Sequence, residues 1–199
     1  MTAILKYIEK EEMKMSKVCV FLADGFEEIE GLTVVDLLRR AGEEVVTVSI
    51  MGRKEITGSH NIHVMADELF ENMDYTQAKL LVLPGGMPGT KYLGAYEPLT
   101  DLLCSWNQEG KLLAAICAAP SVFGDLGLLK GKEAVCYPGF EERLAGATIG
   151  KGAVAVSGNI ITSRGLGTAI DFSAALIGQL QSAEKAEEIK KSIIYGLFQ

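Results

Sequence analysis

One cysteine in this chain stands where a nucleophile would be placed. The apolar run LLAAI, residues 112–116, predicts a buried strand that ends directly before Cys117, and a helix is expected to begin at residue 118 or 119. A strand, a sharp turn and a helix in this order form a nucleophile elbow, which strains the backbone at the nucleophile and crowds its neighbours. Ala115 and Ala119, two positions before and after Cys117, supply the small side chains that this turn needs.

The chemistry that fits such a turn is attack by a thiolate. Backbone N–H groups at a helix N-terminus favour negative charge, so we expect the pKa of Cys117 to lie below the free value of about 8.5. A cysteine at a strand end can also be a small packed side chain, and the spacing alone leaves both interpretations open. Cys19, Cys104 and Cys136 lie within strand or helix runs, where packing is the expected role.

Two other loops are expected to reach the same crevice, because open parallel sheets bind ligands beyond the carboxyl ends of their strands. Glu30 is the carboxylate of the first loop best placed to face Cys117. Partly withdrawn from water, it would have a raised pKa and could hold a proton for the sulfur. Acidic residues at a helix start also interact favourably with the helix dipole without any catalytic role, so this alternative stays open.

The second loop is Pro84-Gly85-Gly86, which follows another apolar run. Glycines allow the backbone to approach a ligand closely, and their N–H groups could stabilise an oxyanion. A glycine pair after a strand can equally be an ordinary turn. No phosphate-binding glycine motif opens a helix here.

The histidines give no sign of a Cys-His dyad or of a metal site. His60 and His63 fall in one extended stretch, where a separation of three residues points side chains to opposite faces, so surface or packing roles are expected. The cysteines show no zinc-site spacing. We therefore predict neither a metal nor a cofactor.

A doubly covered parallel sheet would bring these loops together. Short β-branched runs alternate with helix-period runs, which is the pattern of an α/β fold with helices on both faces. The expected strands are residues 18–22, 45–50, 80–83, 112–116 and 134–137, with hairpins at 56–65 and 153–162. The expected helices are residues 28–41, 98–108, 120–129, 168–180 and 183–195, with Thr168 as a possible cap.

Length and composition limit the remaining possibilities. The chain has 199 residues, 48% of them hydrophobic, which predicts a single domain over residues 16–199 after an N-terminal extension, residues 1–15, that is either mobile or an upstream start. A net charge of −7 argues against nucleic acid as a partner. No apolar signal-peptide core or membrane-length run is visible, so we expect a cytoplasmic protein with free thiols and no membrane partner.

Four sequence blocks carry a family resemblance. FLADGFEEIE, LPGGMPG, AAICAAP and ITSRGLGTAIDF, in this order and spacing, resemble the ThiJ/PfpI family, in the branch that contains the human parkinsonism-associated protein deglycase. The resemblance runs from about residue 17 to 191. It implies a flavodoxin-like three-layer sandwich of the class I glutamine amidotransferase-like type that forms a homodimer. It also implies Cys117 as the elbow nucleophile, Glu30 hydrogen-bonded to its sulfur, and backbone N–H groups from Gly86 and Ala118.

The chain departs from parts of that family at two positions. Tyr137, in VCYPG, stands where some members of the branch carry a histidine near the thiol. A phenol could hydrogen-bond a substrate but is a poor base at neutral pH. Ala118 follows the nucleophile where protease-like members place a histidine, which disfavours a protease, and neither histidine suits a glutamine amidotransferase.

The resemblance implies a cysteine-dependent, cofactor-independent glyoxalase or deglycase. Its substrates would be methylglyoxal-like dicarbonyls or glycated adducts, and its role would be linked to oxidative and carbonyl stress. The alternative is a non-enzymatic redox sensor or chaperone that works through oxidation of Cys117 to the sulfinate. Both need the same reactive thiol, so the sequence does not separate them.

Overall fold

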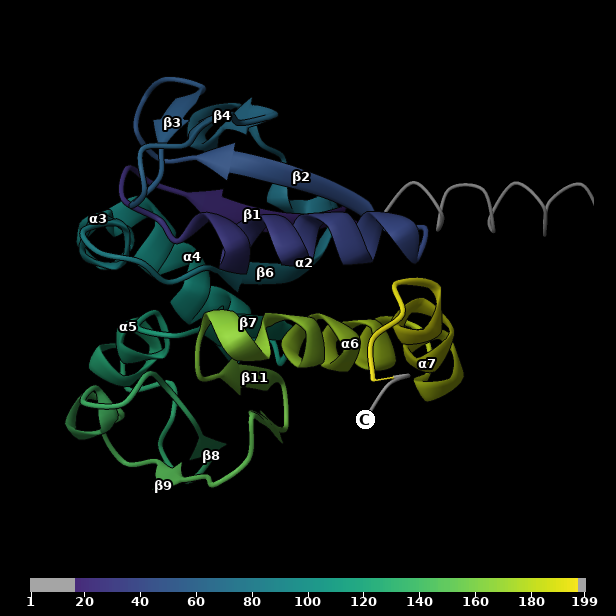
Figure 1. Cartoon of the computed structure of the whole chain (residues 1–199). Helices are drawn as coiled ribbons and strands as arrows, with labels where there is room; N and C mark the ends of the chain where they lie inside the picture. The colour runs from purple at the N-terminus through teal and green to yellow at the C-terminus, as the bar shows by residue number, and fades with distance from the viewer. Residues whose placement is uncertain (1–16, 197–199) are drawn as a thin grey trace, which may run out of the picture.

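A seven-stranded sheet forms the centre of the protein in this computed structural model, which describes residues 17–196 (Figure 1). The extension expected at residues 1–15 lies outside the described residues. The strand order is β10-β11-β7-β6-β1-β2-β5, and neighbouring strands run parallel except for the β10–β11 hairpin at one edge.

The strands and helices follow the expected alternation. The sheet strands are β1 (Lys17–Leu22), β2 (Glu44–Ser49), β5 (Glu68–Leu69), β6 (Ala78–Leu83), β7 (Leu112–Ile116), β10 (Val154–Ser157) and β11 (Ile160–Ser163). Two small sheets pair β3 (Glu55–Thr57) with β4 (His63–Met65) and β8 (Glu133–Ala134) with β9 (Thr148–Ile149). The helices are α2 (Glu28–Arg40), α3 (Gly89–Ala95), α4 (Glu97–Gln108), α5 (Pro120–Asp125), α6 (Ala169–Leu180) and α7 (Ala183–Ser192).

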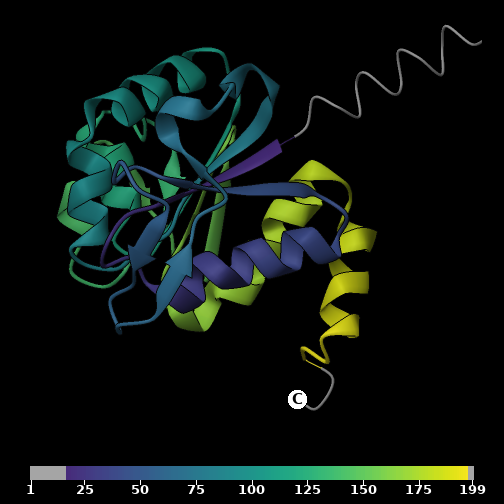
Figure 2. The ribbon, with the colours of Figure 1, turned by 90° about the horizontal axis from the view of Figure 1, so that it is seen from above.

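Two apolar layers cover the sheet, because successive side chains of a strand point to opposite faces. On β1, Val18, Val20 and Leu22 belong to the core shared with α2 and α6. Cys19 and Phe21 belong to the core shared with α4 and α5. Figures 1 and 2 show α2, α6 and α7 together on one side and α3, α4 and α5 on the other. The predicted flavodoxin-like sandwich is confirmed.

The sheet order fixes where the loops meet. Strand β6 lies between β1 and β7, and all three run parallel, so their carboxyl ends share one edge. The loops after these strands carry the segments singled out from the sequence. Topology therefore places Glu30, Gly86 and Cys117 around one crevice.

Two expected elements are shorter in the structure. The strand expected at residues 134–137 is only β8, because the N–H of Val135 donates to Thr162 Oγ1 and that of Tyr137 to the carbonyl of Cys117. The helix expected at residues 120–129 ends at Asp125.

The two C-terminal helices also differ from expectation. Helix α7 ends at Ser192, and Ile194 beyond it has a φ of 63°, which a helix cannot include. Thr168 occupies the cap position of α6, but its hydroxyl bonds the backbone of Gly165 and caps no N–H of α6. The prediction that its side chain caps the helix is therefore wrong.

Candidate active site

Cys117 lies on a strained turn between β7 and α5. Its φ is 66°, a conformation that costs a non-glycine residue roughly 1–3 kcal/mol unless its surroundings hold it. The surroundings do so, because the Cys117 N–H donates to Ser163 O at 3.0 Å and its carbonyl accepts from the N–H of Tyr137 at 2.7 Å. Ala115 and Ala119 are fully buried on either side. This is the geometry of the predicted elbow.

The half-buried sulfur is surrounded by hydrogen-bonding groups from three loops. Backbone N–H groups of Gly86 and Ala118 donate to it, and the Glu30 side chain is hydrogen-bonded to it. A negative sulfur would therefore find two fixed donors and one acid. A developing oxyanion nearby could use the same N–H groups.

Glu30 reaches the sulfur from the first turn of α2 and is only 1% exposed. Its Oε2 accepts from the N–H of Gly85 at 3.0 Å, and the N–H of Leu166 also donates to the carboxylate. Glu27 caps the helix, and its Oε2 accepts from the Glu30 N–H at 2.7 Å. The carboxyl is thus held in one place by the backbone of two loops, and the Glu27 cap fixes the start of the helix that carries it.

Two glycines leave space for this arrangement. A Cβ at Gly85 would lie 2.5 Å from Cys117 Cβ and 2.6 Å from Glu30 Oε2, which is closer than real contacts allow. A Cβ at Gly165 would lie 3.4 Å from Tyr137 Cδ2, 3.6 Å from Glu30 Oε1 and 3.8 Å from Cys117 Sγ. Gly165 therefore marks where Tyr137, which is half exposed, adjoins the thiol and the carboxyl.

The pKa of the thiol is raised, which contradicts the lowered pKa expected from the helix position. Burial is the largest cause, followed by the charge of Glu30 and its hydrogen bond. Together these raise the pKa of Cys117 to about 12, although hydrogen bonds from the Ala118 and Gly86 N–H groups lower it. Burial likewise raises the pKa of Glu30 to about 7. The sequence pattern revealed the helix N–H groups but not the extent of burial.

These two groups titrate as a pair, since the charge of Glu30 raises the pKa of Cys117, whereas the hydrogen bond with Cys117 lowers the pKa of Glu30. The pair loses its first proton near pH 7 and its second near pH 12. Between these values one proton remains, either on sulfur beside a carboxylate or on Glu30 beside a thiolate. The higher pKa of Cys117 leaves this proton mainly on sulfur, and the N–H groups of Gly86 and Ala118 stabilise the minor, reactive arrangement of a thiolate beside protonated Glu30.

His60 and His63 do not share a strand as expected. His60 lies in the turn between β3 and β4, and its Nδ1 donates to Glu28 Oε2 at 2.8 Å. His63 on β4 instead lies 3.1 Å from Thr57 Oγ1. The opposite-faces argument fails because residue 60 is in the turn, and the structure gives His60 a buried carboxylate as partner.

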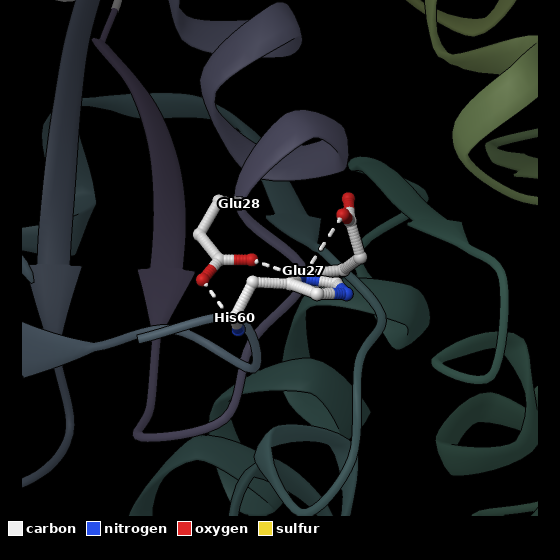
Figure 3. Close-up of side chains that lie close together, drawn as sticks. All are labelled: Glu27, Glu28 and His60. Carbon is white, nitrogen blue, oxygen red and sulfur yellow. Dashed lines mark hydrogen bonds and ion pairs between the residues drawn. The ribbon is translucent and has the colours of Figure 1, made fainter. Parts of the chain in front are cut away.

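Glu27, Glu28 and His60 form one compact group beside the site (Figure 3). Their potential ligand atoms lie within 4.8 Å of one another, close enough to surround a cation. Hydrogen bonds already occupy both Glu28 oxygens: Oε1 accepts from the His60 N–H at 2.7 Å and Oε2 from the ring. We therefore describe the group as an ion pair and assign no metal site.

The structure brings together all five residues singled out from the sequence: Cys117, Glu30, Gly86, Ala118 and Tyr137. It adds Leu166, whose N–H donates to Glu30, and the two glycines that admit the carboxyl. Leu166 was missed because a backbone donor has no side-chain signature. The glycine pair around Leu166, directly after a strand, is the signal that could have indicated it.

Fold and site together define an α/β sandwich protein with a cysteine elbow beside a buried glutamate. The family model described as DJ-1/PfpI family matches residues 16–179. The chain belongs to the DJ-1/PfpI family, which confirms the resemblance seen in its four sequence blocks.

Several relatives are similar over most of this chain. Protein DJ-1 homolog B from Arabidopsis thaliana is 39% identical over 89% of the chain and 41% of its own length. Protein dj-1beta from Drosophila melanogaster is 35% identical over 88% of the chain and 95% of its own length. The solved structure of oxidized Toxoplasma gondii DJ-1 superposes with a TM-score of 0.87 at 39% identity, covering 90% of this chain and 98% of that one. The chain spans less than half the length of the two Arabidopsis relatives.

Among residues 17–196, no helix combines the length and apolar character needed to cross a membrane.

Proposed function

We propose that this protein is a cysteine-dependent glyoxalase or deglycase that acts on methylglyoxal-like dicarbonyls or their adducts and protects against carbonyl and oxidative stress. The observation that carries the proposal is the hydrogen bond between the Glu30 carboxyl and the Cys117 sulfur on a strained elbow. A thiol nucleophile with an adjacent proton carrier is what a dicarbonyl isomerisation needs.

The reaction follows from those two groups. The Cys117 thiolate attacks the aldehyde carbon, a C–S bond forms, and the carbonyl oxygen takes the proton of Glu30 to give a hemithioacetal. Glu30, now a carboxylate, removes the proton from the same carbon and returns it to the neighbouring carbon, while the hydroxyl proton passes from the oxygen of the first carbon to that of the second, which leaves a thioester of the hydroxy acid. Water cleaves the C–S bond and releases lactate. One methylglyoxal and one water give one lactate, without an external oxidant or reductant.

Backbone and ring groups would assist these steps. The N–H groups of Gly86 and Ala118 would stabilise negative charge on the substrate oxygen. Tyr137 would hydrogen-bond the second carbonyl, because its half-exposed side chain adjoins the thiol. This role for Tyr137 needs no proton transfer.

Lactate formation from methylglyoxal tests the proposal. We expect wild-type protein to produce lactate, Cys117→Ala to produce none above background, and Glu30→Gln to lose about 100-fold or more of the rate. Cys104→Ala is the matched control, since Cys104 is a partly exposed free thiol on α4 and should leave the rate unchanged. Equal lactate from wild type and Cys117→Ala would refute the enzyme.

A redox role is the second candidate function. A sulfur that accepts two N–H groups beside a carboxylic acid would also stabilise a sulfinate, which carries negative oxygens. The similar Toxoplasma gondii DJ-1 structure is described as oxidized. In this role oxidation of Cys117 would change partner binding, and the protein would act as a sensor or chaperone.

Mild peroxide treatment followed by mass analysis tests the redox role. We expect two oxygen atoms to be added at Cys117 before any addition at Cys104. Oxidation that starts at Cys104, or that reaches both residues together, would exclude Cys117 as a sensor.

The proposed partner of the chain is a second copy of itself, and the proposed compartment is the cytoplasm. Ile29 on α2 is 47% exposed, which a homodimer interface would cover. The four cysteines are all free in the structure, as a reducing compartment requires.

A further inference from the structure

His60 and the Cys117–Glu30 pair are joined through one residue, Glu27. His60 Nδ1 lies 3.8 Å from Glu27 Oε1 (Figure 3). Glu27 Oε2 accepts from the Glu30 N–H at 2.7 Å. A charge on the imidazole ring therefore acts next to the carboxylate whose charge acts on Glu30.

The hairpin turn holds the ring in this position. Glu28 is 1% exposed, and its carboxylate accepts hydrogen bonds from the His60 N–H and ring and from the Ser59 hydroxyl at 3.3 Å. A Cβ at Gly58 would overlap Glu28 Oε1, so the turn backbone packs directly on the carboxylate. Burial of Glu28 raises its pKa, but the His60 hydrogen bonds outweigh this and lower it to about 2, while Glu28 raises the pKa of His60.

The charged neighbours of both groups are few. Glu27 and Glu28 face His60 from α2, whereas His63 on β4 turns to Thr57. Glu27 and Cys117 are the charged or titratable groups that act on Glu30. The Glu27 charge raises the pKa of Glu30, so any cation that offsets this charge lowers it.

We infer that His60 is a positioning residue that sets the proton affinity of Glu30 by holding and partly neutralising Glu27. With the ring protonated, Glu30 gives up its proton more easily. With the ring neutral, the Glu27 charge acts in full and Glu30 keeps its proton to higher pH. The inference rests on the proposed function only in treating Glu30 and Cys117 as a proton-sharing pair.

Carbon-13 NMR titration of the Glu30 carboxyl tests this coupling. We expect His60→Gln to raise the Glu30 midpoint by roughly 0.3–1 pH unit, with a smaller shift at high salt because the ring is largely exposed. His63→Gln is the matched control and should not move it. Glu27→Gln should lower the midpoint, and adding His60→Gln to Glu27→Gln should then produce almost no further shift.

A reciprocal measurement covers the case in which His60→Gln loosens the hairpin. Coupling between two sites is equal in both directions, so Glu30→Gln should lower the pKa of His60 by the same amount. No shift of Glu30 in His60→Gln, or an equal shift with and without Glu27, would overturn the inference while leaving the proposed function intact. A wild-type Glu30 that does not titrate near pH 7 would overturn the pair itself.

Discussion

At the scale of single residues, the site depends on a carboxyl group that is stable in its neutral form. Glu30 is buried beside Cys117, and burial raises its pKa from 4.5 to about 7. A proton held at that position near neutral pH can be given to a substrate oxygen and taken back. The helix-start position of Glu30 was visible in the sequence, but its burial was not, because burial depends on loops from β6 and β11.

The raised pKa of Glu30 predicts a pH-dependent stability. A carboxyl with a higher pKa in the folded state stabilises the fold below pH 4.5, and this contribution is lost as pH rises through about 7. Compared with Glu30→Gln, wild-type protein should therefore lose about 1–3 kcal/mol of unfolding free energy between pH 4.5 and 8.

Urea unfolding of wild type and Glu30→Gln across this pH range measures the difference in their unfolding free energy. The other titrating groups contribute equally to both proteins and cancel in this difference. A constant difference would mean that Glu30 titrates as an ordinary exposed carboxyl.

At the scale of elements, three loop backbones hold the pair in place. The order of β1, β6 and β7 brings these loops together, and the sequence predicted each strand from its apolar run. The elbow was also predictable, since Ala115 and Ala119 flank Cys117. The hydrogen bonds that the Gly85 and Leu166 N–H groups donate to Glu30 were not, because a backbone N–H acts in the same way whichever residue carries it. The strand position expected for His60 is wrong, because the turn of the hairpin expected at residues 56–65 extends from residue 58 to 62 and includes His60.

The close approach of the β6 loop predicts an asymmetry between two glycine substitutions. Gly85→Ala should destabilise the protein by roughly 1–3 kcal/mol and displace Glu30, because its Cβ would overlap Cys117 and the carboxylate. Gly178→Ala is the control, since nothing lies within 4 Å of its Cβ in α6 and alanine favours a helix by about 1 kcal/mol.

Thermal unfolding and the Cys117 alkylation rate measure the two effects. Retention of both properties in Gly85→Ala would show that the loop does not constrain the pair.

At the scale of the whole molecule, both faces of the sheet are covered by helices, and one of these helices, α2, keeps an apolar residue exposed near the active site. Ile29 precedes Glu30 and is 47% exposed, close to Ile170 and Ile193. A second copy of the chain packed there would exclude water from the wall of the site. The fold class was predictable from the alternation of strand and helix patterns alone. An interface between copies of the chain leaves no such periodic pattern in the sequence.

The proposed homodimer predicts different effects for two exposed apolar residues. Ile29→Asp should convert a dimer into a monomer, because a buried unpaired carboxylate opposes association. Val156→Asp, at a residue 46% exposed on the edge strand β10, should leave the dimer intact. Light scattering at several concentrations gives the mass of each protein. A monomeric wild type would contradict the homodimer.

The pH dependence of Cys117 alkylation by iodoacetamide, followed by peptide mass analysis, tests the shared proton most directly. We predict that the rate rises with a midpoint near pH 7, where the pair loses its first proton, and that Glu30→Gln changes this midpoint. Cys104 in the same digest is the control, and its alkylation should be the same in wild type and in Glu30→Gln. A Cys117 that stays unreactive until above pH 8.5 would show that the pair forms no reactive thiolate near neutral pH, and would contradict the thiolate on which both functions depend.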